Sequence, residues 1–224
     1  MPDAQVRADL DGLADSEVAL QRVLAAGFDP TAPSRLPDWT VGHVVTHVAR
    51  NADAMRRVFA GASVGRVEPM YPDGVDGRAA AIAAGAVRSA PELLDDLVTA
   101  AAALAETLAG VPDPAWREGR GLTLLGERTL PELLLGRWRE VEIHRVDLGI
   151  GGGWESWPPA FVSRVSGPRL AEVNARRGPG ERFRVVTSAG TFGDGPVEVR
   201  AEPARALAYL VGRTAIAGLP DVAF

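Results

Sequence analysis

Residues 137–149 read RWREVEIHRVDLG, and this stretch is the most informative one for the fold of the chain. Its polar residues Arg137, Glu140, His144 and Asp147 follow one another at intervals of three or four positions. Because an α-helix completes a turn about every 3.6 residues, these four side chains share one stripe of a helix. The apolar residues between them leave hydrophobic surface on its other sides. We therefore expect a helix that presents a line of polar groups.

Outward from this helix, the sequence predicts three more helical regions before it. Apolar residues recur at helical spacing, and Gly and Pro interrupt the pattern at the expected ends. Thr40 or Asp38 is a plausible N-cap for the second helix. The connections at 61–77 and 111–130 are expected to be loops, the latter with a short strand at 122–125. The expected helices span about 4–26, 41–60, 78–108 with a break near Pro91, and 129–149, which favours an antiparallel four-helix bundle.

The composition changes after the glycine run 149–153, where we place a domain boundary. A helix at 160–175 is expected to be followed by strands at 183–188 and 196–201, which alternate apolar and polar residues. A turn-rich link joins the two strands, and a final helix is expected at 203–213. The predicted class is α+β, with a bundle at 1–153 and a small α+β domain at 154–224.

Composition narrows the range of functions. The chain has 224 residues, 46% of them hydrophobic, and a net charge of −5, which is typical of a globular protein without a basic surface for nucleic acid or anionic membranes. It contains no cysteine, so disulfides, thiolate metal sites and a cysteine nucleophile are excluded. The first residues do not resemble a secretory signal, and no apolar run approaches the length of a membrane span. We expect a cytoplasmic protein.

The spacing of Glu140 and His144 is suited to metal binding. Residues four apart on a helix can both reach one cation, and zinc accepts a carboxylate oxygen together with imidazole nitrogen. A His₂Glu set with an open fourth position is a catalytic arrangement. The third ligand must come from another helix, and His47 is the leading candidate, with His43 one turn earlier as the alternative.

A structural interpretation of the same residues is also available. A Glu–His pair at this spacing often only supports its helix, and a lone histidine such as His43 is more often surface or core than ligand. Glu142, two positions from both Glu140 and His144, is expected to face solvent. Asp147 opposes the negative end of the helix dipole, which mildly favours a role other than stability.

Three segments resemble the mycothiol-dependent maleylpyruvate isomerases, members of the DinB-like group of metal-binding four-helix bundles. They are DWTVGHVVTHVARNADAM (38–55), MYPDGVDGR (70–78) and REVEIHRVDLG (139–149). A weaker resemblance to the C-terminal domain of that family covers LAYLVGRTA (207–215). The combination of Trp-x₇-His with Glu-x₃-His-x₂-Asp is the most specific part of this resemblance.

The resemblance implies a site and a reaction. His47, rather than His43, joins Glu140 and His144 as a metal ligand. Asp147 and Arg213 become the candidate catalytic residues, with Arg213 as a carboxylate clamp, so that the site would lie between the bundle and the C-terminal domain. Tyr71 and Arg78 match the family pattern without an assigned role.

The implied cofactors are Zn²⁺ and the external thiol mycothiol, and the implied substrate is a small dicarboxylate. Thiolate addition to the double bond of maleylpyruvate, rotation and thiolate expulsion would give fumarylpyruvate. Two alternatives remain open at this point. One is a mycothiol S-transferase that acts on another electrophile, and the other is a non-catalytic metal-binding or ligand-sensing module.

Overall fold

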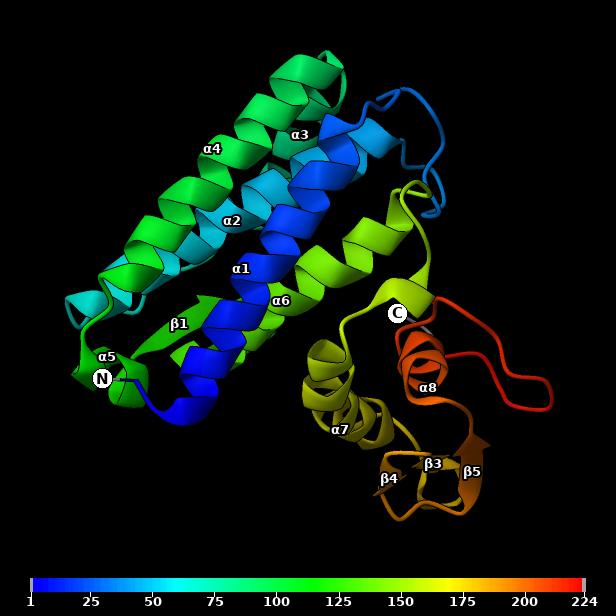
Figure 1. The fold of residues 1–224 in the computed structure, drawn as a ribbon. Coiled ribbons are helices and arrows are strands. Elements are labelled where there is room, and N and C mark those ends of the chain that lie inside the picture. The colour runs from blue at the N-terminus through cyan, green and yellow to red at the C-terminus, as the bar shows by residue number, and fades with distance from the viewer. Residues whose placement is uncertain (1, 223–224) are drawn as a thin grey trace. The chain divides into compact units, whose positions relative to one another are not determined.

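A computed structural model describes residues 2–222 of the chain. These residues form two compact units, one ending at Gly151 and the other beginning at Gly152 (Figure 1). The first unit is almost entirely helical, and the second combines helices with a small mixed sheet. The predicted α+β class is therefore confirmed.

The first unit is built around a bundle of four long helices, as the sequence predicts. In Figure 1, α1 and α6 run in one direction and α2 and α4 in the opposite direction. The segment between α2 and α4 returns the chain to the end at which α2 begins, and it carries a further helix, α3, that packs against α2. The helices are α1 (Ala4–Ala25), α2 (Val41–Ser63), α3 (Gly74–Ala86), α4 (Ala90–Ala109) and α6 (Leu130–Asp147).

Local capping explains where the two central helices begin. The Thr40 hydroxyl accepts the backbone N–H of His43 at the start of α2, which confirms Thr40 as the N-cap. Asp38, the alternative, instead has a φ of 63°. At the start of α6, Thr129 and Glu132 form a reciprocal capping box, and Pro131 occupies the first turn. These caps fix the ends of the two helices that matter for the site.

The connections differ from the prediction in two places. Helix α3 starts at Gly74, so the last part of the predicted loop at 61–77 is helical despite its glycines. The connection after α4 contains a short helix, α5 (Asp113–Glu118), and a hairpin of β1 (Arg120–Thr123) and β2 (Gly126–Thr129). The bounds of the predicted strand at 122–125 are thus wrong, because its second half forms the turn between β1 and β2.

The second unit packs two helices on a three-stranded sheet with order β4-β3-β5. Strand β3 pairs antiparallel with β4 and parallel with β5, and β4 lies inside the stretch expected to be a turn-rich link. The last helix is shorter than predicted and ends at Leu210. The elements are η1 (Trp154–Ser156), α7 (Pro159–Ala175), η2 (Pro179–Glu181), β3 (Phe183–Thr187), β4 (Gly190–Phe192), β5 (Val197–Arg200) and α8 (Pro203–Leu210).

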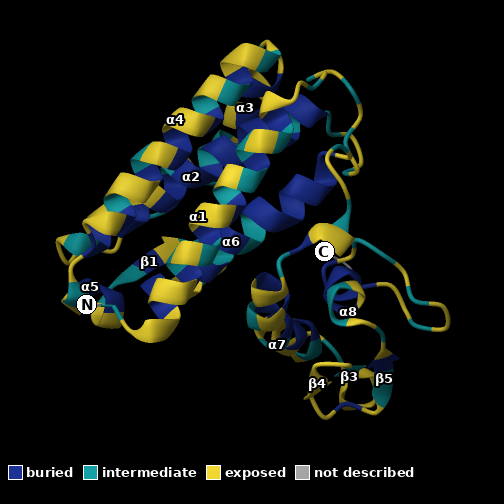
Figure 2. Cartoon of the chain, viewed as in Figure 1, coloured by how far each residue is buried: buried dark blue, intermediate teal, exposed yellow. Residues whose placement is uncertain are grey.

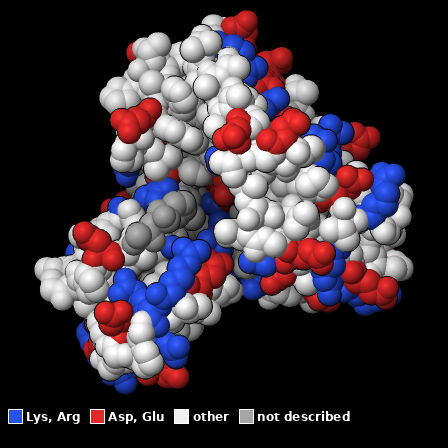
Figure 3. Space-filling view, turned by 180° about the vertical axis from the view of Figure 1, so that it is seen from behind, with Lys and Arg blue, Asp and Glu red and all other residues white. Residues whose placement is uncertain are grey.

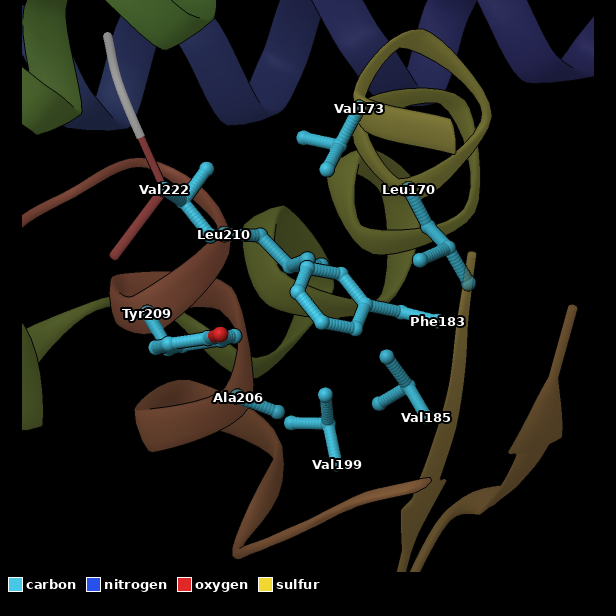
Figure 4. Close-up of a cluster of buried hydrophobic side chains, with 9 residues drawn as sticks. All are labelled: Leu170, Val173, Phe183, Val185, Val199, Ala206, Tyr209, Leu210 and Val222. Carbon is cyan, nitrogen blue, oxygen red and sulfur yellow. The ribbon is translucent and has the colours of Figure 1, made fainter. Parts of the chain in front are cut away.

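A compact apolar cluster forms the core of the second unit (Figure 4). The ring of Phe183 lies at its centre and meets the ring of Tyr209 edge-on, with 5.6 Å between centroids. The Tyr209 hydroxyl donates a hydrogen bond to the carbonyl of Pro220, so its one polar atom is satisfied. The cluster consists of Leu170, Val173, Phe183, Val185, Val199, Ala206, Tyr209, Leu210 and Val222.

Burial is distributed differently in the helices of the first unit. In Figure 2, α1 and α4 show exposed and buried faces, whereas α6 is buried along most of its length. Acidic and basic side chains lie close together over the face shown in Figure 3, in keeping with the modest net charge of −5. No helix among residues 2–222 is long and apolar enough to span a membrane.

Candidate metal centre

His43 and His47 lie one turn apart on α2 but have different surroundings. The ring Nδ1 of His43 is 2.9 Å from the hydroxyl oxygen and 3.2 Å from the backbone nitrogen of Thr40, so this ring closes the N-terminal cap of α2. The ring of His47 is buried and faces α6. Geometry therefore separates the two candidates that the spacing alone left open.

Three side chains from α2 and α6 converge on one point. Nε2 of His47 lies 2.8 Å from Oε2 of Glu140 and 3.1 Å from Nε2 of His144. Nε2 of His144 lies 3.4 Å from the same carboxylate oxygen. The donor atoms all lie within 4.8 Å of one another, so one ion could contact all three.

The donor set and its dimensions fit a small divalent metal. Four ligands at about 2.1 Å around a tetrahedral zinc ion lie roughly 3.4 Å apart. The observed separations of 2.8, 3.1 and 3.4 Å require only a small outward movement of the side chains. Two imidazole nitrogens and one carboxylate oxygen match the His₂Glu sets of catalytic zinc sites, which leave a position for an outside ligand.

The charges of the three groups are strongly coupled. Burial by itself would raise the pKa of Glu140, but hydrogen bonds and electrostatic attraction from His144 and His47 hold that pKa well below its ordinary value. Burial lowers the pKa of His47, an effect that Glu140 only partly offsets. Burial also opposes the charged form of His144, yet the hydrogen bonds that its ring donates to the carboxylates of Asp147 and Glu140 raise its pKa to about 9. The site therefore holds a carboxylate, a neutral imidazole and an imidazolium at neutral pH.

Asp147 orients His144 from behind. Its Oδ2 lies 2.9 Å from Nδ1 of His144, and the carboxylate is completely buried. The Nδ1–H group of His144 donates to this carboxylate, which leaves Nε2 directed at Glu140 and His47. A carboxylate behind a histidine is the usual device that fixes the ring of a metal ligand. The structure thus places Asp147 next to a ligand candidate.

His47 has a positively charged partner on the side of its ring that faces away from Glu140 and His144. A guanidinium nitrogen of Arg78 lies 3.1 Å from Nδ1 of His47, and because a guanidinium only donates, Nδ1 accepts this bond. The indole of Trp39 meets the same imidazole edge-on at 5.6 Å. Its neighbour Asp38 has the left-handed φ of 63°, a conformation that costs energy in a non-glycine residue. The sequence did not predict the contact between Arg78 and His47. It identified Arg78 only as part of the segment 70–78 that resembles the family.

Two charged residues of α6, Arg137 and Glu142, are fully buried, and the burial of Glu142 contradicts the prediction from the sequence. Glu142 was expected to face solvent but is fully buried, with its carboxylate 2.7 Å from the guanidinium of Arg145. Arg137 shares the stripe with Glu140 as predicted, but it is directed into the bundle rather than to a ligand. It donates to Glu17 on α1 and to the carbonyl of Val48 on α2. The prediction for Glu142 was wrong because this part of α6 is buried on both sides. A side chain that points away from His144 is therefore still not exposed to solvent.

Arg213 belongs to the second unit and follows the end of α8. Its backbone N–H donates to the carbonyl of Ala208, and its guanidinium donates to the carbonyl of Val211 at 2.8 Å. The predicted helix at 203–213 therefore stops before it, and Arg213 is a residue of the turn that follows.

Comparison with known proteins gives one family and two similar structures. The family described as "Mycothiol maleylpyruvate isomerase N-terminal domain" matches residues 12–149. A crystal structure of the mycothiol-dependent maleylpyruvate isomerase shares 24% sequence identity and a TM-score of 0.83, covering 93% of this chain and 90% of that one. The structure of a histidine-to-alanine mutant of that isomerase shares 23% identity and a TM-score of 0.84, with the same coverage. No curated protein sequence matches the chain.

Proposed function

This chain belongs to the family of the mycothiol maleylpyruvate isomerase N-terminal domain, and from that premise we propose that it is a zinc- and mycothiol-dependent cis–trans isomerase. The proposed reaction converts maleylpyruvate into fumarylpyruvate. The observation that carries the proposal is the convergence of His47, Glu140 and His144 in a chain without cysteine. Such a site can recruit a thiol that the protein does not provide itself.

In this proposal, each of the three ligands has a distinct part. His47 and His144 offer neutral nitrogen through Nε2, and Glu140 offers an anionic oxygen that offsets part of the charge of the cation. When bound, a zinc ion keeps a coordinated thiol deprotonated at neutral pH, and the resulting nucleophilic sulfur can remove and restore the double bond of the substrate. The chain itself thus has to hold the ion, orient the reactants and exclude competing water.

We propose two further residues for the reaction. Asp147 acts as a positioning residue, because its contact with Nδ1 fixes which nitrogen of His144 is available. Arg213 is proposed as a catalytic residue that binds a carboxylate of the dianionic substrate, a task suited to the paired donors of a guanidinium. Its test is Arg213→Lys, which keeps the charge but loses the planar pair of donors and should raise KM more than it lowers kcat.

The decisive assay follows maleylpyruvate with and without mycothiol, using the zinc-loaded protein. We expect fumarylpyruvate only when both zinc and thiol are present, and no net consumption of thiol. His43→Ala is a matched control, because His43 lies one turn from His47 but takes part in the cap instead of the donor cluster. Turnover without thiol would contradict the proposal, and a thiol conjugate that accumulates would replace the isomerase by an S-transferase.

A further inference from the structure

Arg78 differs from the other arginines inside the bundle in its partners. Arg50, Arg88, Arg137 and Arg145 each form an ion pair with a carboxylate. Within residues 2–222, no carboxylate lies within ion-pair distance of Arg78, although this side chain is half-buried on α3. A partly buried guanidinium without an anionic partner is costly, which suggests that its partner is a molecule that binds to the protein.

The position of Arg78 links it to the metal centre. Its guanidinium contacts Nδ1 of His47 at 3.1 Å, and its central carbon lies 5.7 Å from the centre of the Tyr71 ring. The aromatic face attracts the guanidinium and restricts its motion. Arg78 is thus held on the outer side of one proposed ligand, next to the metal centre.

The charge balance of the site favours an anion at this point. Glu140 and Asp147 together offset the two positive charges of a divalent cation, and both carboxylates are already engaged by the histidines. The guanidinium of Arg78 then leaves one positive charge without compensation. A site with a net positive charge attracts anionic ligands.

The hydrogen-bonding capacity of His47 adds a second argument. A neutral imidazole has one proton, so a ring that binds a metal through Nε2 carries that proton on Nδ1. Nδ1 is then a donor and no longer accepts from Arg78. With His47 in use as a ligand, the guanidinium of Arg78 needs another acceptor, and an incoming carboxylate supplies two.

We propose that Arg78, supported by Tyr71, is a carboxylate-binding residue of the metal site and selects small organic acids as substrates. This inference rests on the proposed function for the identity of the reaction. The binding of a carboxylate, however, can be measured without turnover. A dicarboxylate has two carboxylate groups. Arg78 is proposed to bind one of them, and Arg213 was proposed above to bind the other.

The test measures the binding of maleate to zinc-loaded protein by calorimetry, without thiol so that no reaction occurs. Arg78→Met should raise the Kd for maleate by roughly ten- to a hundredfold, as expected for the loss of charge-assisted hydrogen bonds. Arg78→Lys should recover part of this loss. Arg88→Met is the matched control, because it also removes one positive charge. Arg88 lies just after α3 and pairs with Asp96 on α4 instead of contacting His47. Zinc content and Tm are recorded for every variant.

The outcomes separate this inference from the proposed function. Unchanged maleate affinity in Arg78→Met, or an equal loss in Arg88→Met, would overturn the role of Arg78 even if the wild type turns out to be a thiol-dependent isomerase. The absence of maleate binding to the wild type would overturn it as well. If Arg78→Met weakens maleate binding but the wild type does not isomerise maleylpyruvate, the carboxylate site stands and the proposed function falls.

Discussion

Helix α6 of the first unit buries charged side chains, whereas the core cluster of the second unit is apolar. On α6, the buried polar residues are Arg137, Glu142, His144, Arg145 and Asp147. The cluster around Phe183 contains only one polar side-chain atom, the Tyr209 hydroxyl, and that atom is hydrogen-bonded. Apolar burial stabilises a fold directly, while buried ion pairs at best repay their desolvation. The buried charges on α6 therefore need partners, and two of them, His144 and Asp147, belong to the proposed metal centre.

The largest expected effect comes from breaking the pair of the buried Arg137 and the partly buried Glu17. Arg137→Met removes the donor to Glu17 and to the carbonyl of Val48, leaving the partly buried carboxylate without its cation. We expect a loss of about 4 kcal/mol in the free energy of unfolding of the first unit, measured by urea denaturation. The double variant Arg137→Met/Glu17→Gln should recover part of this loss. If the double variant is less stable than Arg137→Met, the unpaired charge of Glu17 is not the cause of the loss.

A slightly smaller loss is expected in the apolar core of the second unit. Leu210→Ala opens a cavity beside Phe183 and should cost about 3 kcal/mol. Because the proposed ligands all belong to the first unit, zinc affinity should be unchanged under conditions where the variant is folded. Zinc affinity that falls together with the stability of the second unit would show that the two units do not act separately in metal binding.

The contact between Asp147 and His144 tests whether charge on α6 serves the metal. Asp147→Asn keeps the size of the side chain but removes the anion behind His144. We expect zinc affinity to fall by about ten- to a hundredfold, as for other partners of metal-binding histidines. Glu142→Gln is a useful comparison, because Glu142 is buried on the same helix but pairs with Arg145 instead of a proposed ligand. Equal losses of affinity in both variants would contradict a specific role for Asp147.

The smallest effect is the dependence of zinc affinity on pH. In the metal-free protein the pKa of His144 is about 9, so zinc has to displace one proton from this ring at lower pH. The pKa of His47 is lowered by burial and that of Glu140 is well below its ordinary value, so neither adds a proton near neutrality. Apparent affinity should therefore rise by up to about tenfold per pH unit between pH 6.5 and 8, with one proton released per zinc.

The same pKa shift has the opposite consequence for the stability of the metal-free protein. Because the folded-state pKa of His144 lies above the ordinary value of 6.5, its charged form stabilises the fold. This contribution is complete below about pH 6.5 and disappears as the pH rises through 9. Denaturation measured across this range, with Asp147→Asn as the variant that removes one cause of the shift, shows whether stability falls with the predicted sign.

The sequence predicted those features that depend on local geometry. The capping residues Thr40 and Thr129 mark helix starts, and four-residue spacing alone places Glu140 and His144 on one face. The meeting of His47 with this pair depends on how α2 packs against α6. No local pattern encodes that packing, so the choice over His43 came from family resemblance.

Other features could not be predicted because they depend on burial or on long connections. The spacing predicts that Glu142 faces water because it points away from His144, but every residue from Val141 to Asp147 is buried and Arg145 compensates the charge of Glu142. The contact of Arg78 with His47 requires α3 to fold back along α2, whereas the glycines before Arg78 predict a loop. In both cases the sequence does not show which helix packs against the residue.

The most direct test of the account is a zinc titration of the purified metal-free protein, with a chelator of known affinity as competitor. We expect one zinc ion per chain, and no tight zinc binding in His47→Ala or His144→Ala, while both variants keep the helical circular dichroism of the wild type. His43→Ala should bind zinc as the wild type does. If His47→Ala and His144→Ala still bind one zinc ion with wild-type affinity, these side chains are not the ligands, and the proposed metal centre is wrong.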